Sequence, residues 1–147
     1  MTTTNEVHQT GPVQSALRVT VGTTLAALAT NLTVFTTARA ADVSFQFAQP
    51  GSAGPQTISA GAVLAATLVT MAMGWIVVGL AAWRHRPTLR TIAIVGGVIA
   101  TASAVAPLAL EADLSVRGAL AGLHLITGAF FITGIGGLRR GGIGGIR

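Results

Sequence analysis

The polar side chains inside apolar stretches are the residues of this sequence that could do chemistry. His124 is foremost, because it lies within the apolar residues 116–138, where an ionisable group needs a polar partner. Asn31, Thr67 and Ser103 lie in three other apolar stretches. If these stretches cross a membrane in alternating directions, all four side chains fall in its outer half. We therefore expect a polar cluster at one depth.

This cluster supports two hypotheses, and the sequence leaves both open. In the first, neutral His124 exchanges hydrogen bonds with Asn31 or Ser103 in a small, pH-sensitive pocket for a lipid or small molecule. Acidic residues at the outer mouth would raise its basicity. The candidate ligand-binding residues are then Asn31, Thr67, Ser103, Glu111, Asp113 and His124. In the second, His124 and Asn31 only clip helices together, at about 0.6 kcal/mol per hydrogen bond.

The sequence lacks the residues that metal binding, haem binding and nucleophilic catalysis require. The chain has no cysteine, so thiolate metal sites and cysteine nucleophiles are excluded. His8, His85 and His124 fall in a tail, a loop and a span, so we expect no metal site and no haem. Ser103 lies in an ordinary helical run rather than on a nucleophile turn. We expect no catalytic residue and no cofactor, and an enzyme using His124 as a base is the weakest alternative.

The composition indicates an integral membrane protein. Of 147 residues, 51% are hydrophobic and only 9% are charged, whereas soluble domains carry about 25% charged residues. The mean hydropathy is +0.70. The basic residues are all arginines, placed singly or in pairs at the edges of apolar runs, which suits membrane orientation and argues against a nucleic-acid partner.

Four apolar stretches are long enough to cross about 30 Å of hydrocarbon as helices. They cover residues 17–38, 60–83, 89–110 and 116–138. We therefore predict an all-α transmembrane domain, a bundle of four transmembrane helices over residues 17–138. Residues 1–16 have the composition of a disordered tail, and residues 139–147 form a short Gly/Arg tail.

The connection between the first two spans has a different pattern. Val43, Phe45 and Phe47 alternate with polar residues before a Gly/Pro loop, which predicts a short extracytoplasmic β-hairpin, with a disordered loop as the alternative. Ser59 can cap the helix that follows. Ala38-Arg39-Ala40 resembles a signal-peptide cleavage site, so removal of the first span is also open.

The distribution of arginine predicts the orientation. Seven arginines fall on one side of the four spans, whereas Arg39 and Arg117 fall on the other. The positive-inside rule then places both termini in the cytoplasm of a multi-pass protein of the cell membrane. Small residues such as Gly118 and Gly122 let helices approach closely, within one chain or in a homodimer.

Several short motifs resemble a family of uncharacterised four-helix membrane proteins from actinobacteria. They are the Thr- and Asn-bearing first span, Ser44-Phe45-Gln46-Phe47, the Pro/Gly loop, Glu111-Ala112-Asp113 and Ala121-Gly122-Leu123-His124-Leu125. The resemblance implies a membrane location and a four-helix fold, but no activity. We expect a non-enzymatic accessory or structural component of the cell envelope, in contact with lipids and with another membrane protein or a second copy. The alternative is a binding or transport protein with a polar pocket in the outer half.

Overall fold

Four α-helices make up most of the computed structural model, which describes residues 11–48, 54–84 and 89–140. The helices are α1 (Pro12–Ala40), α2 (Ala60–Arg84), α3 (Leu89–Val105) and α4 (Leu114–Arg140). All four are long and apolar enough to cross a membrane, α3 together with the short helix that follows it. The prediction of a four-helix membrane bundle is confirmed.

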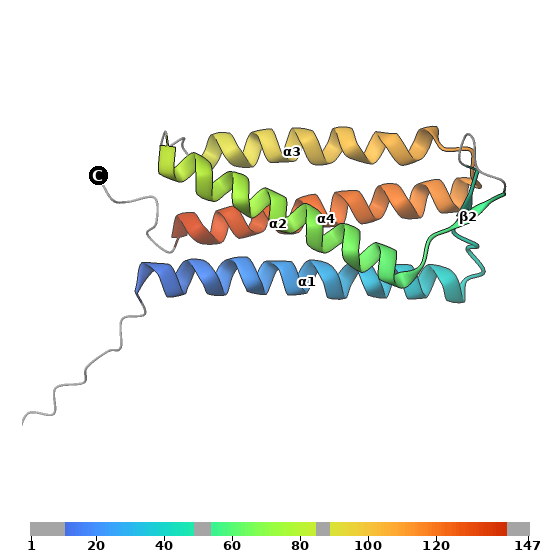
Figure 1. The fold of residues 1–147 in the computed structure, drawn as a ribbon, viewed down its shortest axis with the longest axis horizontal. Helices are drawn as coiled ribbons and strands as arrows, with labels where there is room; N and C mark the ends of the chain where they lie inside the picture. The colour runs from blue at the N-terminus through green and yellow to red at the C-terminus, as the bar shows by residue number, and fades with distance from the viewer. Residues whose placement is uncertain (1–10, 49–53, 85–88, 141–147) are drawn as a thin grey trace, which may run out of the picture.

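The helices lie side by side, and α4 is the one that joins the others (Figure 1). It packs against α1 and α3, while α2 packs mainly on α1. Helix α2 runs obliquely to the other three helices in this view. We call the half of the bundle that contains Pro12 and Arg140 the terminal half. The half next to the β-strands is the hairpin half.

The predicted hairpin is present between α1 and α2. Strands β1 (Gln46–Phe47) and β2 (Gln56–Thr57) pair antiparallel, with Gln46 opposite Thr57. The simple alternation breaks at Phe45, whose φ of 51° places it in the left-handed region. This conformation turns the Phe45 ring into the bundle, where it is fully buried. Residues 49–53 of the predicted turn lie outside the described residues.

Proline accounts for two of the differences between the helix boundaries and the predicted spans. Helix α1 begins at Pro12, so residues 12–16 are helical rather than part of a disordered tail. Proline suits a first helical position because its φ is already helical and its missing N–H has no partner there. Conversely, Pro107 interrupts the third span: α3 ends at Val105 and continues as the 3₁₀ helix η1 (Ala106–Ala109).

Two further boundaries are the start of α2 and the end of α4. Ser59 Oγ accepts a hydrogen bond from the Ala62 N–H at 3.1 Å, which confirms the predicted cap of α2. Helix α4 runs through Arg139 and Arg140, which were placed in the C-terminal tail. The remaining tail residues, 1–10 and 141–147, lie outside the described residues.

The two halves have separate cores. In the hairpin half, Phe35, Phe45, Val63, Val116 and Leu123 pack together. In the terminal half, the buried residues are Val78, Ile135 and Leu138, with Trp75 and Phe131 packed against them. Many large apolar side chains face outward instead, including Leu25, Ile99 and Val98, each more than half exposed. An apolar exterior of this kind suits a lipid environment.

Candidate functional site

Asn31 is the centre of a buried polar cluster that joins three helices. Its Nδ2 atom donates to Thr67 Oγ1 on α2 at 2.9 Å and to Thr127 Oγ1 on α4 at 2.8 Å. Asn31 is 1% exposed, and the two threonines are 5% and 7% exposed. We call these three residues the Asn31 cluster. They link α1, α2 and α4 within the hairpin half.

Almost every side-chain hydrogen-bond donor and acceptor of the Asn31 cluster has a partner. Thr67 Oγ1 donates to the Val63 carbonyl at 2.8 Å, and Thr127 Oγ1 donates to the Leu123 carbonyl at 2.9 Å. Each threonine oxygen therefore accepts from Asn31 while its own proton is used within its helix. Only Asn31 Oδ1 is buried without a hydrogen-bond donor. The cluster has one vacant acceptor and no vacant donor.

His124 does not join this cluster. It is exposed on the bundle surface and has no hydrogen-bond partner in the described part of the chain. Ser103 is half-buried, and its Oγ donates to the Ala100 carbonyl of its own helix at 2.8 Å. The hydrogen bonds expected between His124 and Asn31 or Ser103 are therefore absent among these residues. Asn31 acts as an interhelix clip, as the second hypothesis expected, but with Thr127 in the place of His124.

One face of α4 is covered at Phe131 and exposed at His124. His124 and Phe131 are seven residues apart, so they lie on the same face of α4, two turns from each other. At Phe131 this face is covered, because the Trp75 ring of α2 lies 5.0 Å away, between ring centroids, and a Cβ on Gly96 of α3 would meet the Phe131 ring at 2.8 Å. At His124 the side chain is exposed.

The two acidic candidates lie apart from the Asn31 cluster, beside the hairpin. Glu111 is exposed, and its carbonyl accepts a hydrogen bond from the Ala48 N–H at 3.1 Å. Asp113 is also exposed and directly precedes α4. Fourteen residues separate Asp113 from Thr127, which corresponds to roughly 20 Å along the helix. The six candidate residues therefore do not form one pocket.

Sequence reasoning missed Thr127 and the pair formed by Trp75 and Thr24. Thr127 precedes Gly128, whose added Cβ would overlap the Ala100 Cβ, so close helix packing marks this face of α4. The adjacent Thr127 and Gly128 were the signal in the sequence that could have marked this face of α4. Trp75 Nε1 donates to Thr24 Oγ1 at 3.1 Å, which ties α2 to α1 in the terminal half. Nothing in the sequence pairs these two residues.

The polar side chains described above are arranged for hydrogen bonding rather than for covalent catalysis. Within residues 11–48, 54–84 and 89–140, no three His, Cys, Asp or Glu side chains come together as metal ligands would. The Ser103 proton is directed to a backbone carbonyl, so it is not activated by His124. The described residues offer one buried polar cluster with a single vacant acceptor, Asn31 Oδ1, and one exposed imidazole without a partner among them.

Comparisons with known proteins place the chain in a family. The search of curated proteins and the search of solved structures each found no match. A model of DUF6069, described as a family of unknown function, matches residues 11–140. This match spans all four helices and the hairpin, so the chain belongs to the DUF6069 family of unknown function.

Proposed function

We propose that this protein is a non-enzymatic component of the cell membrane that binds a second membrane protein through the α4 face bearing His124. The observation that carries this proposal is the exposed imidazole, which has no partner among the described residues. Ionisable side chains inside a span are costly and are usually paired with another polar group. A polar side chain on a transmembrane helix of the partner would supply that pairing.

The surroundings of His124 suit contact with another helix. Leu125, the next residue of α4, is 48% exposed, so an apolar side chain adjoins the imidazole on the surface. A polar side chain set among apolar residues is a usual source of interhelical hydrogen bonds in lipid. A transmembrane helix with a hydrogen-bonding side chain at matching depth is the partner that this face fits.

The same proposal includes the orientation of the chain. Seven of the nine arginines belong to the terminal side of the bundle, so both termini face the cytoplasm. The hairpin and the exposed carboxylates of Glu111 and Asp113 then lie outside the cell membrane. His124 is closer to this outer surface, two to three turns from the start of α4.

Binding of a lipid or small molecule in the hairpin half is the second candidate. It is favoured by the Asn31 Oδ1 atom, which is buried and accepts no hydrogen bond. A ligand with a hydroxyl or N–H group could donate to this oxygen. Such a ligand would have to enter a cluster whose three side chains are at most 7% exposed, so the helices would have to separate locally.

Photo-crosslinking in the native membrane tests the leading proposal. A photoreactive residue at Leu125 should give one adduct of defined mass, and the adduct should disappear when His124→Leu is added. The matched control is the same residue at Leu25, which is 59% exposed on α1. Adducts that form equally at both positions, or that persist in His124→Leu, would contradict a docking role for this face.

Native mass spectrometry of the gently extracted protein identifies the occupant. A second protein in one-to-one ratio that is lost in His124→Leu supports the proposal. A dimer lost in the same variant makes the partner a second copy of this chain. A lone chain carrying one small molecule, released by Asn31→Leu but not by His124→Leu, would favour the second candidate instead.

A further inference from the structure

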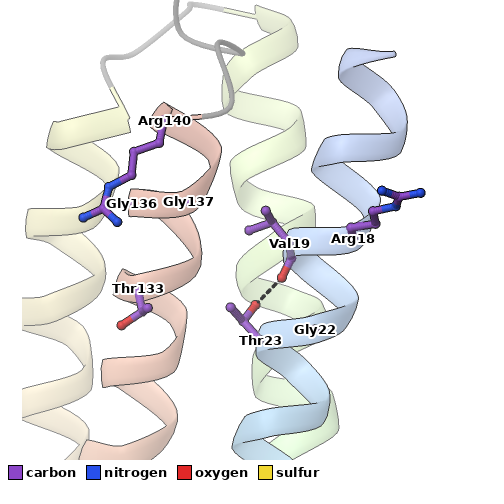
Figure 2. Close-up of a pocket in the computed structure, with 8 residues that line it drawn as sticks. All are labelled: Arg18, Val19, Gly22, Thr23, Thr133, Gly136, Gly137 and Arg140. Carbon is purple, nitrogen blue, oxygen red and sulfur yellow. Dashed lines mark hydrogen bonds between the residues drawn. The ribbon is translucent and has the colours of Figure 1, made fainter. Parts of the chain in front are cut away.

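A groove of about 470 Å³ lies between α1 and α4 in the terminal half. Figure 2 shows α1 and α4 as its two walls, with Arg18 on the α1 side and Arg140 on the α4 side of its rim. It is lined by Arg18, Gly22, Thr23, Thr133, Gly136 and Arg140, among others. Thr133 is seven residues before Arg140, so the groove extends about 10 Å from the end of α4 towards the middle of the bundle.

The arginines at the rim have no acidic partner among the residues that the structure describes. Both side chains are exposed, and neither guanidinium has a hydrogen-bond or ion-pair partner in the described part of the chain. Three of the four acidic residues, Asp42, Glu111 and Asp113, lie at the hairpin end, and the fourth, Glu6, is outside the described residues. The rim of the groove is therefore positively charged and needs an anion from outside the described bundle.

The two guanidinium groups flank the groove and point away from each other (Figure 2). Because neither holds a partner among the described residues, rotation of either side chain towards a shared anion breaks no hydrogen bond there. An arginine guanidinium presents several N–H donors in a planar fork that matches phosphate oxygens. A phosphate at the mouth of the groove would thus be held between two cationic side chains.

Below the rim the groove is narrow and mostly uncharged. Its floor is the contact of α1 with α4, where a Cβ on Gly137 would meet Val19 Cγ1 at 3.1 Å. The side chains of Thr23 and Thr133 donate to carbonyls of their own helices, at 2.7 and 2.8 Å, so their oxygens can only accept further hydrogen bonds. Added Cβ atoms on Gly22 and Gly136 would meet open space. An acyl chain and the hydroxyls of a lipid headgroup suit this lining.

We propose that this groove binds one anionic phospholipid, with its phosphate between Arg18 and Arg140 and an acyl chain along Gly22 and Gly136. Basic clefts between transmembrane helices are a known type of site for anionic headgroups. The order of the lining residues fits this orientation, because Gly22 and Gly136 each lie one turn further from the helix end than the arginine of the same helix. The proposal is independent of the partner bound at His124, which lies in the other half of the bundle.

Competition between two lipids in native mass spectrometry tests this site. The full chain is extracted into micelles containing equal amounts of phosphatidylglycerol and phosphatidylcholine with identical acyl chains. Wild type should retain one phosphatidylglycerol in preference. The double variant Arg18→Gln/Arg140→Gln should lose about 30-fold of this preference, because each basic residue near an anionic lipid surface contributes about 1 kcal/mol.

Two further variants separate the groove from general positive charge. Gly136→Leu should also remove the retained lipid, because the new side chain enters open space in the groove and leaves both arginine charges in place. Arg139→Gln removes the neighbouring charge, which does not line the groove, and should leave the preference intact. Gly79→Leu is the matched control for the glycine change, since it also adds a side chain in open space, on α2. Thermal unfolding of each variant verifies that the bundle is folded.

Several results would overturn the proposal. Equal retention of both lipids by wild type would remove the anion preference. An unchanged preference in Arg18→Gln/Arg140→Gln or in Gly136→Leu would show that the lipid binds elsewhere. An equal loss in Arg139→Gln would assign the preference to net charge alone. Displacement of the lipid by millimolar inorganic phosphate would assign the arginines to a soluble anion.

Discussion

The Asn31 cluster of the hairpin half and the two arginines at the groove of the terminal half use their polar groups in opposite ways. In the hairpin half, Asn31 is buried and uses both amide protons inside the protein, on threonines of two other helices. In the terminal half, Arg18 and Arg140 lie at an open groove without a partner among the described residues. The Asn31 cluster therefore holds helices together, whereas the two arginines are available to a ligand.

The two halves also fill their cores differently. Phe45 enters the hairpin half from outside the helices, and its ring lies 4.5 Å from that of Phe35, between centroids. In the terminal half, the Trp75 and Phe131 rings fit against glycines of neighbouring helices. Truncation of the Phe45 side chain does not require the helices to move, whereas the glycine contacts set the distance between neighbouring helices. The comparison therefore predicts different responses to mutation in the two halves.

Truncation of Phe45 should have the largest effect on stability. Phe45→Ala should lower the free energy of unfolding by about 3–5 kcal/mol, the usual cost of truncating a fully buried phenylalanine. Denaturant titration in micelles measures this change. Phe47→Ala, at a half-buried position of the same hairpin, should cost clearly less. Equal effects of the two changes would mean that Phe45 does not anchor the hairpin to the bundle.

Filling a glycine contact in the terminal half should have the next largest effect. A Cβ on Gly134 would lie 2.5 Å from Trp75 Cη2, so Gly134→Leu forces α2 and α4 apart. We expect a loss of about 1–3 kcal/mol, as is typical of overpacked cores. Gly118→Leu on the same helix adds its side chain in open space in the hairpin half and should have no such cost. Unfolding curves that are the same for both variants would remove the proposed role of the glycines.

Loss of the Asn31 clip should have a smaller effect. Asn31→Ala removes two interhelix hydrogen bonds, which average about 0.6 kcal/mol each in membranes, so we expect a loss of about 1 kcal/mol. Thr67 and Thr127 keep their bonds to backbone carbonyls and are not left unpaired. His124→Ala is the comparison, and should change the stability of the isolated protein by less than about 0.5 kcal/mol. A larger loss in His124→Ala than in Asn31→Ala would reverse the roles assigned to these residues.

The fold was largely predictable because its signals are local. Four apolar runs, the turn residues of the hairpin and the Ser59 cap are each read from adjacent residues. The predicted third span ran through Pro107, because proline ends the α-helix without ending the apolar run. The helical start at Pro12 was missed for a similar reason, since polar composition alone does not prevent a helix.

The candidate site was only partly predictable because its members come from different helices. Asn31 and Thr67 were expected at one depth, and they do form a hydrogen bond. Which side chain of α4 meets them depends on how α2 crosses the bundle. His124 was the more conspicuous residue by its chemistry, yet Thr127 lies on the covered side. The groove at Arg18 and Arg140 was also missed, because those arginines were interpreted only as signals of orientation.

The sequence by itself therefore determined that this chain forms four membrane-spanning helices, since hydrophobic length and charge at helix ends act within each segment. Tertiary structure alone decided which polar groups are satisfied inside the protein and which remain free. The physical reason is that each pairing requires side chains from different helices, and helix crossing angles depend on packing at all contacts together. Residues of α2 and α3 pack against Phe131, whereas His124 is exposed, although both lie on one face of α4.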